Sequence, residues 1–587
     1  MRKKDEELET TTIWQEYQKG VDYNRMKGIY TDTEQNYAFY HGDQWRGAKT
    51  GDIKPIVLNV IKPIVKYKLG VINQNGYAVC FNPNNFDNPD MLSDMQELCK
   101  NLSKNADLIW EREQIDNKIR EVVKDSCINS EGIAYNFFDE TENKISVEVI
   151  DKNNIYYGNE ADSDIQSQPY IILSFRRTVS SVKEEAEANG MSKEEIDNIV
   201  ADNDIEEQAG YDGNNQEISD MCLVLLKLYR KNGTIHSKKC TKFATIQKEI
   251  DHETKLYPVA HMIWEELKGS ARGTGEVKYN IANQIEINKT AMRRAIAVKL
   301  GAYPRAVVNT QFVQNPSALN KVGATIKLEN GNIDDVRKQV GYLNPTNMSA
   351  DSKYLQDELM KNTQELAGAG DTVTGNVDPT QASGKAIIAV QQSAQQPLNE
   401  QLNKFKTFLE DMARIWFDIW QAYETDGLTI LKTEQIEQQD EFGNINTVEQ
   451  EIPYTIPYEV LQGLKVNIKV DVTPKSAYDR FAVEQSLENL MLQQKITFEE
   501  YVDALPLDSV MDKQKLQAIL KKREDNKKQI QIIQQRAEEQ MQNIKNALYE
   551  REVANNQVNY DIDRIQQTGN EQLTNMMGGV SNAMREM

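Results

Sequence analysis

The sequence predicts a predominantly helical α+β protein. Stretches at 91–126 and 275–300 carry apolar residues at three-to-four spacing, which is the period of a helix with one buried face. Between them, 133–268 changes to a period of two, which is typical of strands. The chain has 587 residues and a hydrophobic content of 39%, a modest share for a compact monomer. We therefore expect several domains or one elongated subunit of several parts, much of it polar helix or loop, or surface that other subunits cover.

The first 126 residues are expected to be mainly helical. Residues 1–40 are polar and helical, and 40–45 (YHGDQW) form a turn flanked by aromatic residues. Two X-Pro steps are expected to break the segment 53–77. One helix is predicted over 91–126, and its apolar positions are Leu92, Met95, Leu98, Leu102, Ala106, Ile109, Ile115, Ile119 and Val122.

Strands follow from about residue 133. Ile145, Val147 and Val149 alternate with polar residues, and Asn232-Gly233 joins two β-rich runs in the manner of a type I′ hairpin. The acidic segment 180–216 interrupts the strands, and we interpret it as a helical insertion whose charges form a solvated face.

Residues 275–424 are predicted to be long helices with two interruptions. The first helix runs from about Gly275 to Leu300, and Tyr303-Pro304 ends it. Short strands and turns occupy 305–345, and a second helix spans 349–366. A glycine-rich linker, 368–384, precedes a third helix that begins at Ser383. The first helix carries an apolar stripe that we expect to pack between subunits: Ile281, Ile285, Met292 and Ile296.

The last part of the chain returns to strands and then to helix. Residues 429–475 are predicted to form strands, because apolar and polar residues alternate in VNIKVDV. The segment DEFGN is expected to be a protruding turn. Beyond them, helix dominates to the end. Near-heptad spacing continues through Ile530, Ile533, Ala537, Met541, Ile544 and Leu548.

Charge and composition argue against several classes of function. The formal net charge of −22 is unlike that of a protein that grips nucleic acid through phosphates. Five dispersed cysteines indicate reduced thiols, and four histidines leave little material for a metal site. No apolar stretch is long enough for a membrane span, and the N-terminus has no secretory signal. We expect no metal, no cofactor and no membrane.

No motif supports an enzyme. GNVDPTQASGKA has Pro379 where a phosphate-binding loop needs its first glycine and Ala386 where it needs a hydroxyl. KGSARGTGE resembles a dinucleotide fingerprint only loosely, and a turn between strand and helix explains its glycines better. No GxSxG occurs, and His41 is better explained as a packed turn residue than as a base.

The order of elements resembles the portal proteins of tailed double-stranded DNA bacteriophages. Four motifs carry the resemblance and together span most of 37–525. They are YHGDQW with Asn59-Val60-Ile61, GTGEVKYNIANQIEINKTAMRRA at a strand–stem junction, GNVDPTQASGKAIIAVQQSA at a tunnel loop, and the helical pair LMLQQKITFEEYVDALPLDSVMDKQKLQAILKKRED. The resemblance implies no enzymatic activity and no cofactor.

The resemblance also implies a division of the chain into the parts of a portal subunit that forms a ring. The expected parts are a wing at 1–270, a stem helix at 271–302, a clip at 303–348, a second stem helix at 349–367, a tunnel loop at 368–384, a tunnel or wing helix at 385–428, a wing β segment at 429–475, and a helical crown at 476–587. For the end of the crown, the sequence is compatible with either a helical barrel or a disordered segment.

The implied function is a ring, typically a dodecamer, at one vertex of the virion, through which double-stranded DNA is packaged and ejected. The implied partners are the major capsid protein, scaffold protein, large terminase and a head–tail adaptor, with assembly in the host cytoplasm. DNA-facing residues are expected at Asp371, Thr372, Val373, Thr374, Gly375, Asn376, Val377 and Asp378, with Ser383 and Gly384 at the start of the tunnel helix. The linker has no Lys or Arg before Lys385, which suits a channel that must not hold phosphates tightly.

Two other functions stay open at this point. One is a cytoplasmic adaptor whose coiled-coil C-terminal tail dimerises. The other is a nucleotide-driven motor, which the defective phosphate loop argues against. Electron microscopy would separate a ring from a rod or a compact particle.

Overall fold

The chain forms two units, Met1–Thr473 and Pro474–Met587. The structure, a computed structural model, describes residues 2–48, 54–84, 89–202, 220–302, 305–321, 323–329, 340–343, 351–370, 396–439, 445–474, 487–493 and 495–504, with short pieces between 515 and 543 and residues 568–575. None of the helices within these ranges is long and apolar enough to cross a membrane.

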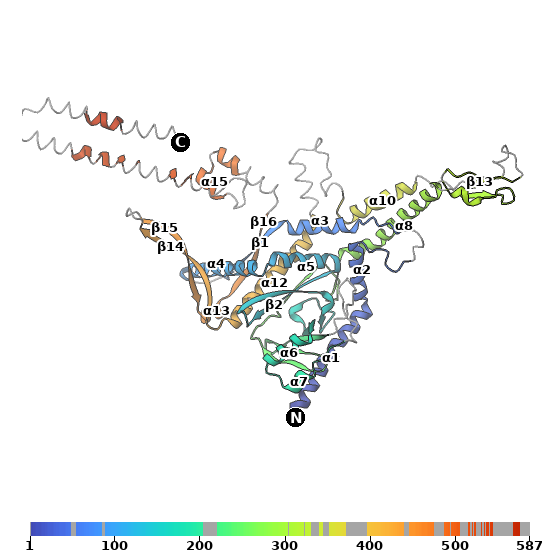
Figure 1. Ribbon diagram of the computed structural model, residues 1–587. Helices are drawn as coiled ribbons and strands as arrows, with labels where there is room; N and C mark the ends of the chain where they lie inside the picture. The colour runs from blue at the N-terminus through green and yellow to red at the C-terminus, as the bar shows by residue number, and fades with distance from the viewer. Residues whose placement is uncertain are drawn as a thin grey trace, which may run out of the picture. The chain divides into compact units, whose positions relative to one another are not determined.

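Two helices separated by a glycine open the first unit (Figure 1). α1 (Arg2–Lys27) and α2 (Ile29–His41) meet at Gly28, whose φ of 71° glycine adopts at little cost. α2 ends at Gly42, and the Gly42 N–H donates to the Ala38 carbonyl (3.0 Å). The predicted polar helix and the turn after it are confirmed.

Proline enters the next helix without breaking it. α3 (Ile61–Asn73) has Pro63 in its first turn, where a backbone N–H has no helical partner. The Asn59 side chain accepts the Lys62 N–H (3.1 Å) and so caps this end. The prediction of a break at this X-Pro step is therefore wrong. β1 (Asn75–Pro83) follows and pairs with β16 (Val466–Pro474).

The segment predicted as one helix over 91–126 forms two. α4 (Pro89–Arg112) and α5 (Ile115–Asn129) are separated by Gln114, a non-glycine residue at φ 51°. The apolar periodicity continues across the break, so it gives no sign of the change in direction. Seven of the predicted apolar positions on these two helices are buried: Leu98, Leu102, Ala106, Ile109, Ile115, Ile119 and Val122.

Two antiparallel sheets fill the β-rich region. One has the order β3-β2-β9 and the other the order β4-β5-β6-β7-β8. Asn232 (φ 56°) and Gly233 (φ 95°) make the hairpin between β6 and β7, which confirms the predicted turn. The strands are β2 (Glu131–Asp139), β3 (Lys144–Ile150), β4 (Ile155–Tyr157), β5 (Tyr170–Thr178), β6 (Met221–Lys231), β7 (Thr234–Cys240), β8 (Thr245–Asp251) and β9 (Val259–Ile263).

The acidic insertion is helical in its described part and contributes to a core. α6 (Val179–Ala188) carries Val182 and Ala186, which are buried with Val224 of β6, and the short α7 (Lys193–Asp197) follows it. In its described part the insertion has charged residues such as Glu184 and Glu187 exposed, as interpreted, and an apolar side that is buried. Residues 203–219 lie outside the described part of the chain.

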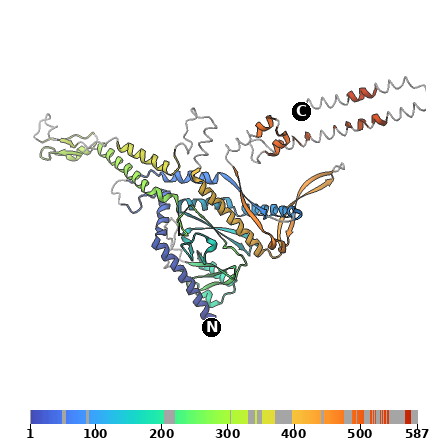
Figure 2. The same cartoon turned by 180° about the vertical axis from the view of Figure 1, so that it is seen from behind.

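A pair of adjacent helices extends from the sheets (Figures 1 and 2). The short strands β10 (Glu265–Glu266) and β11 (Gly273–Thr274) lead into α8 (Glu276–Ala302), and α10 (Asp351–Leu366) packs along α8. At their outer end β12 (Arg305–Val308) pairs with β13 (Val340–Leu343), and a 3-10 turn covers Pro316–Asn320. Both predicted helices are confirmed, and so is the strand predicted in RAVVNTQFV. The segment GATIKLENG, predicted to hold another strand, has only an isolated bridge at Leu328 in its described residues, and the partner of β12 lies later in the chain. The glycines before α8 join strand to helix.

The largest hydrophobic core surrounds α12 (Asn399–Tyr423), which follows a 3-10 turn at Gln396–Leu398. Trp416 and Trp420 are almost fully buried, and the Trp416 Nε1–H donates to Asn136 Oδ1 (2.9 Å). α12 ends at Tyr423, before the expected 428. The next elements are β14 (Leu428–Gln439), β15 (Ile445–Ile456) and α13 (Tyr458–Gly463).

Most described residues of the second unit are helical, apart from Pro474 at the end of β16 and the turn residues 493 and 495–497. Tyr501 and Val502 of α15 (Phe498–Ala504) form a small core. The near-heptad residues Ile530, Ile533, Ala537 and Met541 are helical, and Ile544 and Leu548 lie outside the described residues. Ile533 and Met541 are exposed, so this helix does not cover its own apolar stripe.

Gly275→Ala should destabilise the first unit. A Cβ at Gly275 would lie 2.6 Å from the Ile128 carbonyl oxygen, so the end of α5 and the start of α8 would have to separate. We expect the free energy of unfolding to fall by about 1–3 kcal/mol, measured by urea denaturation with tryptophan fluorescence. Gly70→Ala is the control. Nothing lies within 4 Å of that position on α3, so it should be neutral or stabilising. Equal losses in the two variants would contradict the close approach.

Candidate functional site

The residues predicted to face DNA lie outside the described part of the chain, but the residues on both sides of them are anchored. Residues 371–395 are not described, and they include Asp371 to Asp378, Ser383 and Gly384. On the N-terminal side, Gly368 (φ 69°) ends α10, and the Ala369 N–H donates to the Gln364 carbonyl (2.8 Å). Ala367 and Ala369 are buried in a cluster with Ile287 of α8. On the C-terminal side, Leu398 is buried in the main core.

Side chains of α8 form hydrogen bonds to the backbone of the segment that precedes α3. The Val60 N–H donates to Gln284 Oε1 (2.9 Å), and Gln284 Nε2 donates to the Leu58 carbonyl (2.8 Å). The Leu58 N–H donates to Asn288 Oδ1 (3.0 Å). Both side chains are almost fully buried, so these bonds satisfy backbone groups that water cannot reach. We call this network the polar lock.

The polar lock brings together motifs that are far apart in the sequence. Asn288 Nδ2 donates to Gln44 Oε1 (2.6 Å), which connects α8 to the YHGDQW turn. Asn59 Nδ2 donates to the Tyr40 carbonyl (3.0 Å). The YHGDQW turn, the Asn59-Val60-Ile61 motif and the stem-junction helix therefore meet at one place. Sequence reasoning missed the role of Gln284, although a buried amide pair at i and i+4 on an apolar helix face is a detectable signal.

A buried charge cluster fixes the root of α8. Arg272 Nη1 lies 3.2 Å from Glu131 Oε2, and Arg272 Nε lies 3.4 Å from Glu160 Oε2. Arg272 also donates to the carbonyls of Lys152 (3.0 Å) and Ile155 (2.8 Å). Burial alone would raise the pKa of Glu131, but Arg272, His261 and Lys152 together outweigh the effect of burial and lower the pKa to about 2. The cluster therefore ties the segment before α8 to β2 and β4.

The predicted stem stripe lies partly inside the chain's own core. Ile281 and Ile285 are half-buried against the main core, Met292 is buried, and Ile296 is half-buried. Packing of these residues between subunits stays a prediction. The helix pair also exposes large apolar side chains that do not belong to the predicted stripe. They are Tyr279, Val298, Tyr354, Leu355 and Leu366.

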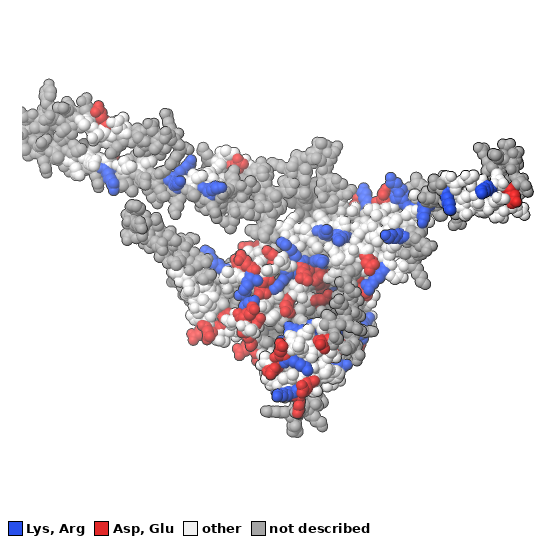
Figure 3. Space-filling model, in the orientation of Figure 1, with Lys and Arg blue, Asp and Glu red and all other residues white. Residues whose placement is uncertain are grey.

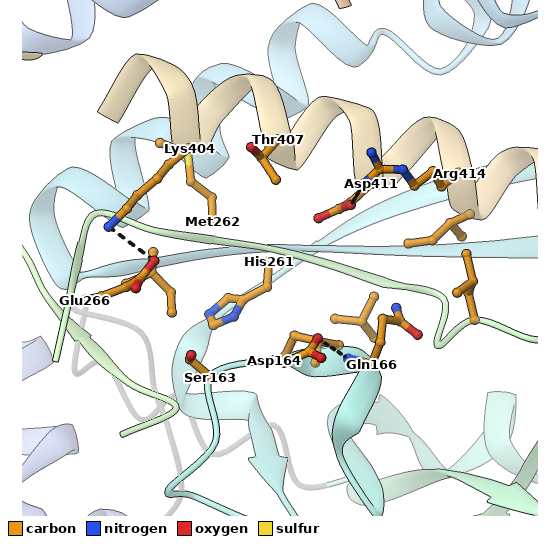
Figure 4. Close-up of a pocket in the computed structure, with 15 residues that line it drawn as sticks. Ser163, Asp164, Gln166, His261, Met262, Glu266, Lys404, Thr407, Asp411 and Arg414 are labelled. Carbon is orange, nitrogen blue, oxygen red and sulfur yellow. Dashed lines mark hydrogen bonds and ion pairs between the residues drawn. The ribbon is translucent and has the colours of Figure 1, made fainter. Parts of the chain in front are cut away.

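A cavity of about 410 Å³ lies between α12 and the loop at 163–166 (Figure 4). Ser163, His261 and Asp164 line it, which are the residue types of a charge relay. Among the described residues, however, no hydrogen bond joins Ser163 to His261, and Asp164 accepts the Gln166 N–H (2.9 Å). Lys404, on the opposite wall, is 3.4 Å from Glu266. The cavity does not have the geometry that nucleophilic catalysis requires.

Glu131→Gln should destabilise the protein in a pH-dependent way. It leaves the buried Arg272 without its main partner, and we expect a loss of about 3–5 kcal/mol at neutral pH. Because the folded-state pKa of Glu131 is below its ordinary value of 4.5, its stabilising effect is complete above that pH and disappears as the pH falls toward 2.

Urea denaturation as a function of pH measures this effect. The difference in the free energy of unfolding between wild type and Glu131→Gln should become smaller as the pH falls from 4.5 toward 2. Glu142→Gln, which removes an exposed partner of Lys144, should change stability by less than about 0.5 kcal/mol. A difference that did not vary with pH would contradict the assignment.

Comparison with known proteins identifies the family. No curated protein matches the chain. The family model of the phage P22-like portal protein matches residues 176–567, which is more than half of the chain. Three of the four motifs behind the resemblance lie in this range, and YHGDQW with Asn59-Val60-Ile61 lies before it. The chain belongs to the P22-like phage portal protein family.

Proposed function

We propose that this chain is the subunit of a ring, a dodecamer, at one capsid vertex of a tailed phage. Double-stranded DNA enters and leaves through its channel, and the virion is its final location after assembly in the host cytoplasm. Its partners are the major capsid protein, the scaffold protein, the large terminase and the head–tail adaptor. Family membership and the unpartnered apolar side chains of α8 and α10 support the proposal.

In this proposal the parts of the chain have distinct tasks. α8 and α10 form the stem, β12 and β13 belong to the clip at 303–348, and the linker 368–384 is the tunnel loop. The wing combines 1–270 with 429–475, the helix of 385–428 crosses it, and the crown is 476–587. The anchoring of Ala369 and Leu398 supports the tunnel-loop assignment, because it fixes both ends of the segment that must withstand passing DNA.

The exposed apolar residues are the observation that carries ring formation. Val298 on α8 and Tyr354 on α10 are 71% and 70% exposed. Large apolar groups gathered on one helix pair mark an interaction surface more often than isolated ones do. A repeated contact between identical subunits would remove them from water on every copy.

Assembly can be tested by charge insertion on the helix pair. Val298→Asp with Tyr354→Asp should shift the purified protein from rings to monomers, measured by native mass spectrometry and electron microscopy. Both side chains are exposed in the subunit, so its own stability should not fall. Met26→Asp with Val200→Asp, at exposed apolar sites on other elements, is the control and should keep rings. A wild-type protein that is monodisperse and monomeric at micromolar concentration would refute the proposal, and a rod would favour the coiled-coil adaptor.

The tunnel-loop assignment has a separate test. Deleting 371–378 should leave rings intact, because the anchors on both sides remain. It should reduce DNA packaging or retention, measured as protected DNA per particle after nuclease treatment. Normal packaging by intact rings with this deletion would contradict the assignment while leaving the ring itself unaffected.

A further inference from the structure

The helix α3 lies in a stretch of the chain that has no acidic residue. The 34 residues from Ile53 to Phe86 contain no Asp or Glu and four lysines, whereas the whole chain has a net charge of −22. Of these lysines, Lys68 is buried and pairs with Glu276 (2.7 Å), but Lys62 and Lys66, one turn apart on α3, reach solvent. Figure 3 shows blue side chains along the upper edge of the first unit, where Figure 1 labels α3.

A third lysine approaches this side of α3 from α5. The Lys62 Nζ and the Lys124 Nζ lie 5.8 and 5.9 Å from the centre of the Tyr40 ring, so two ammonium groups contact one aromatic ring. Burial, Lys124 and Lys62 lower the pKa of His41 at the end of α2, as expected where positive charge gathers. The three residues Lys62, Lys66 and Lys124 are called the lysine face.

The lysine face has no counter-charge within the described part of the subunit. No carboxylate there forms an ion pair with any of its three lysines. Asp125 follows Lys124 in the chain, but its Oδ1 accepts the hydroxyl of Tyr37 (2.5 Å). Gathered like charges repel one another, so an anion that binds here from outside the subunit relieves this repulsion.

The helix α3 packs against the residues from which the proposed tunnel loop begins. Ile64, which lies between Lys62 and Lys66 in the sequence, is almost fully buried in one cluster with Ala367 and Ala369. The lysine face is therefore carried by an element that contacts one anchor of the linker 368–384. Under the proposed function, that linker meets DNA.

The solvent side of α3 suits phosphates better than a protein surface. All of α3 is described, and none of its large apolar side chains is exposed. A Cβ at Gly70, one turn after Lys66, would have nothing within 4 Å, so the space beside the lysines is open. Protein interfaces usually have an apolar centre, whereas lysines and other donors contact phosphates without one. DNA is therefore favoured over an acidic protein as the occupant.

We propose that the lysine face contacts the phosphates of DNA as the duplex passes through the ring. This rests on the proposed function and adds to it a DNA contact on α3, apart from the linker 371–378. Each ammonium group contributes a contact that weakens as the salt concentration rises. Because the chain as a whole is acidic, these contacts guide the duplex without holding it tightly.

The contact is tested by a photo-crosslinking amino acid in place of Gly70, in infected cells during DNA packaging. This position adjoins the lysine face, leaves its three charges in place and has room for the probe. We expect a crosslink to DNA, as from the same probe at Thr374 in the linker and unlike the probe at Lys193 on α7. DNA crosslinks at Thr374 but not at Gly70 would overturn the inference and leave the proposed function intact, and so would a crosslink from Gly70 to a protein in place of DNA. Assembled rings that crosslink DNA at neither position would refute both.

The charges are tested by combining Lys62→Gln, Lys66→Gln and Lys124→Gln in the chain that carries the Gly70 probe. The yield of crosslinked DNA should fall by roughly threefold or more, because three phosphate contacts are lost. The matched control changes three exposed lysines elsewhere on the subunit and should leave the yield within about twofold: Lys100→Gln, Lys193→Gln and Lys268→Gln. Native mass spectrometry should show rings for both variants, which separates loss of the contact from loss of the ring. An unchanged yield in the first variant, or equal losses in both, would contradict a role for these charges and overturn the inference.

Discussion

The ion pair between Arg272 and Glu131 determines where α8 leaves the sheets, and the helix pair depends on it. Two charges removed from water are tolerated only when each finds a partner and its remaining polar atoms are satisfied. Arg272 meets this condition with two carboxylates and two backbone carbonyls that lie between β2 and the loop after β4. The cost of rearranging these groups makes the direction of α8 insensitive to forces applied further along the helix.

The polar lock extends this rigidity along roughly the first three turns of α8. Gln284 and Asn288 complete the hydrogen bonds of Leu58 and Val60, so the segment that precedes α3 cannot leave without exposing buried backbone groups. Beyond this point the same helix changes character: Ile287 is fully buried, whereas Val298 is 71% exposed. A root fixed by buried polar contacts and an outer half with exposed apolar side chains are the properties expected of an element that presents a surface to other molecules.

Charge follows the same division. The first unit pairs many of its acidic residues with lysines and arginines inside the subunit, as Lys278 does with Asp32. Further along α8 and the strands after it, Arg293 pairs with Glu286 (2.8 Å), whereas Lys289, Lys299, Lys321 and Lys327 have no ion pair among the described residues. In the proposed ring, the acidic net charge of the chain would limit adhesion to DNA.

Periodicity and turn chemistry were sufficient to locate most elements. Alternation in Ile145, Val147 and Val149, the Asn232-Gly233 turn and the stripe on α8 are local patterns, and local backbone preferences determine them. Local patterns did not predict the helix break at Gln114 or the position of Pro63 inside a helix. The break leaves the apolar period unchanged, and the helix around Pro63 depends on the hydrogen bond that the Asn59 side chain accepts at its start.

The sequence by itself determined the classes of element, their order and the family resemblance, because these depend on residues close together in the chain. Only the tertiary structure decided that Arg272 pairs with Glu131, that Gln284 serves Val60, and that Ile281 faces the core while Val298 does not. These contacts depend on which distant segments of the chain lie side by side in the folded structure. The pattern of apolar and charged residues along the sequence does not specify which segments those are, so it does not determine burial or ion pairing.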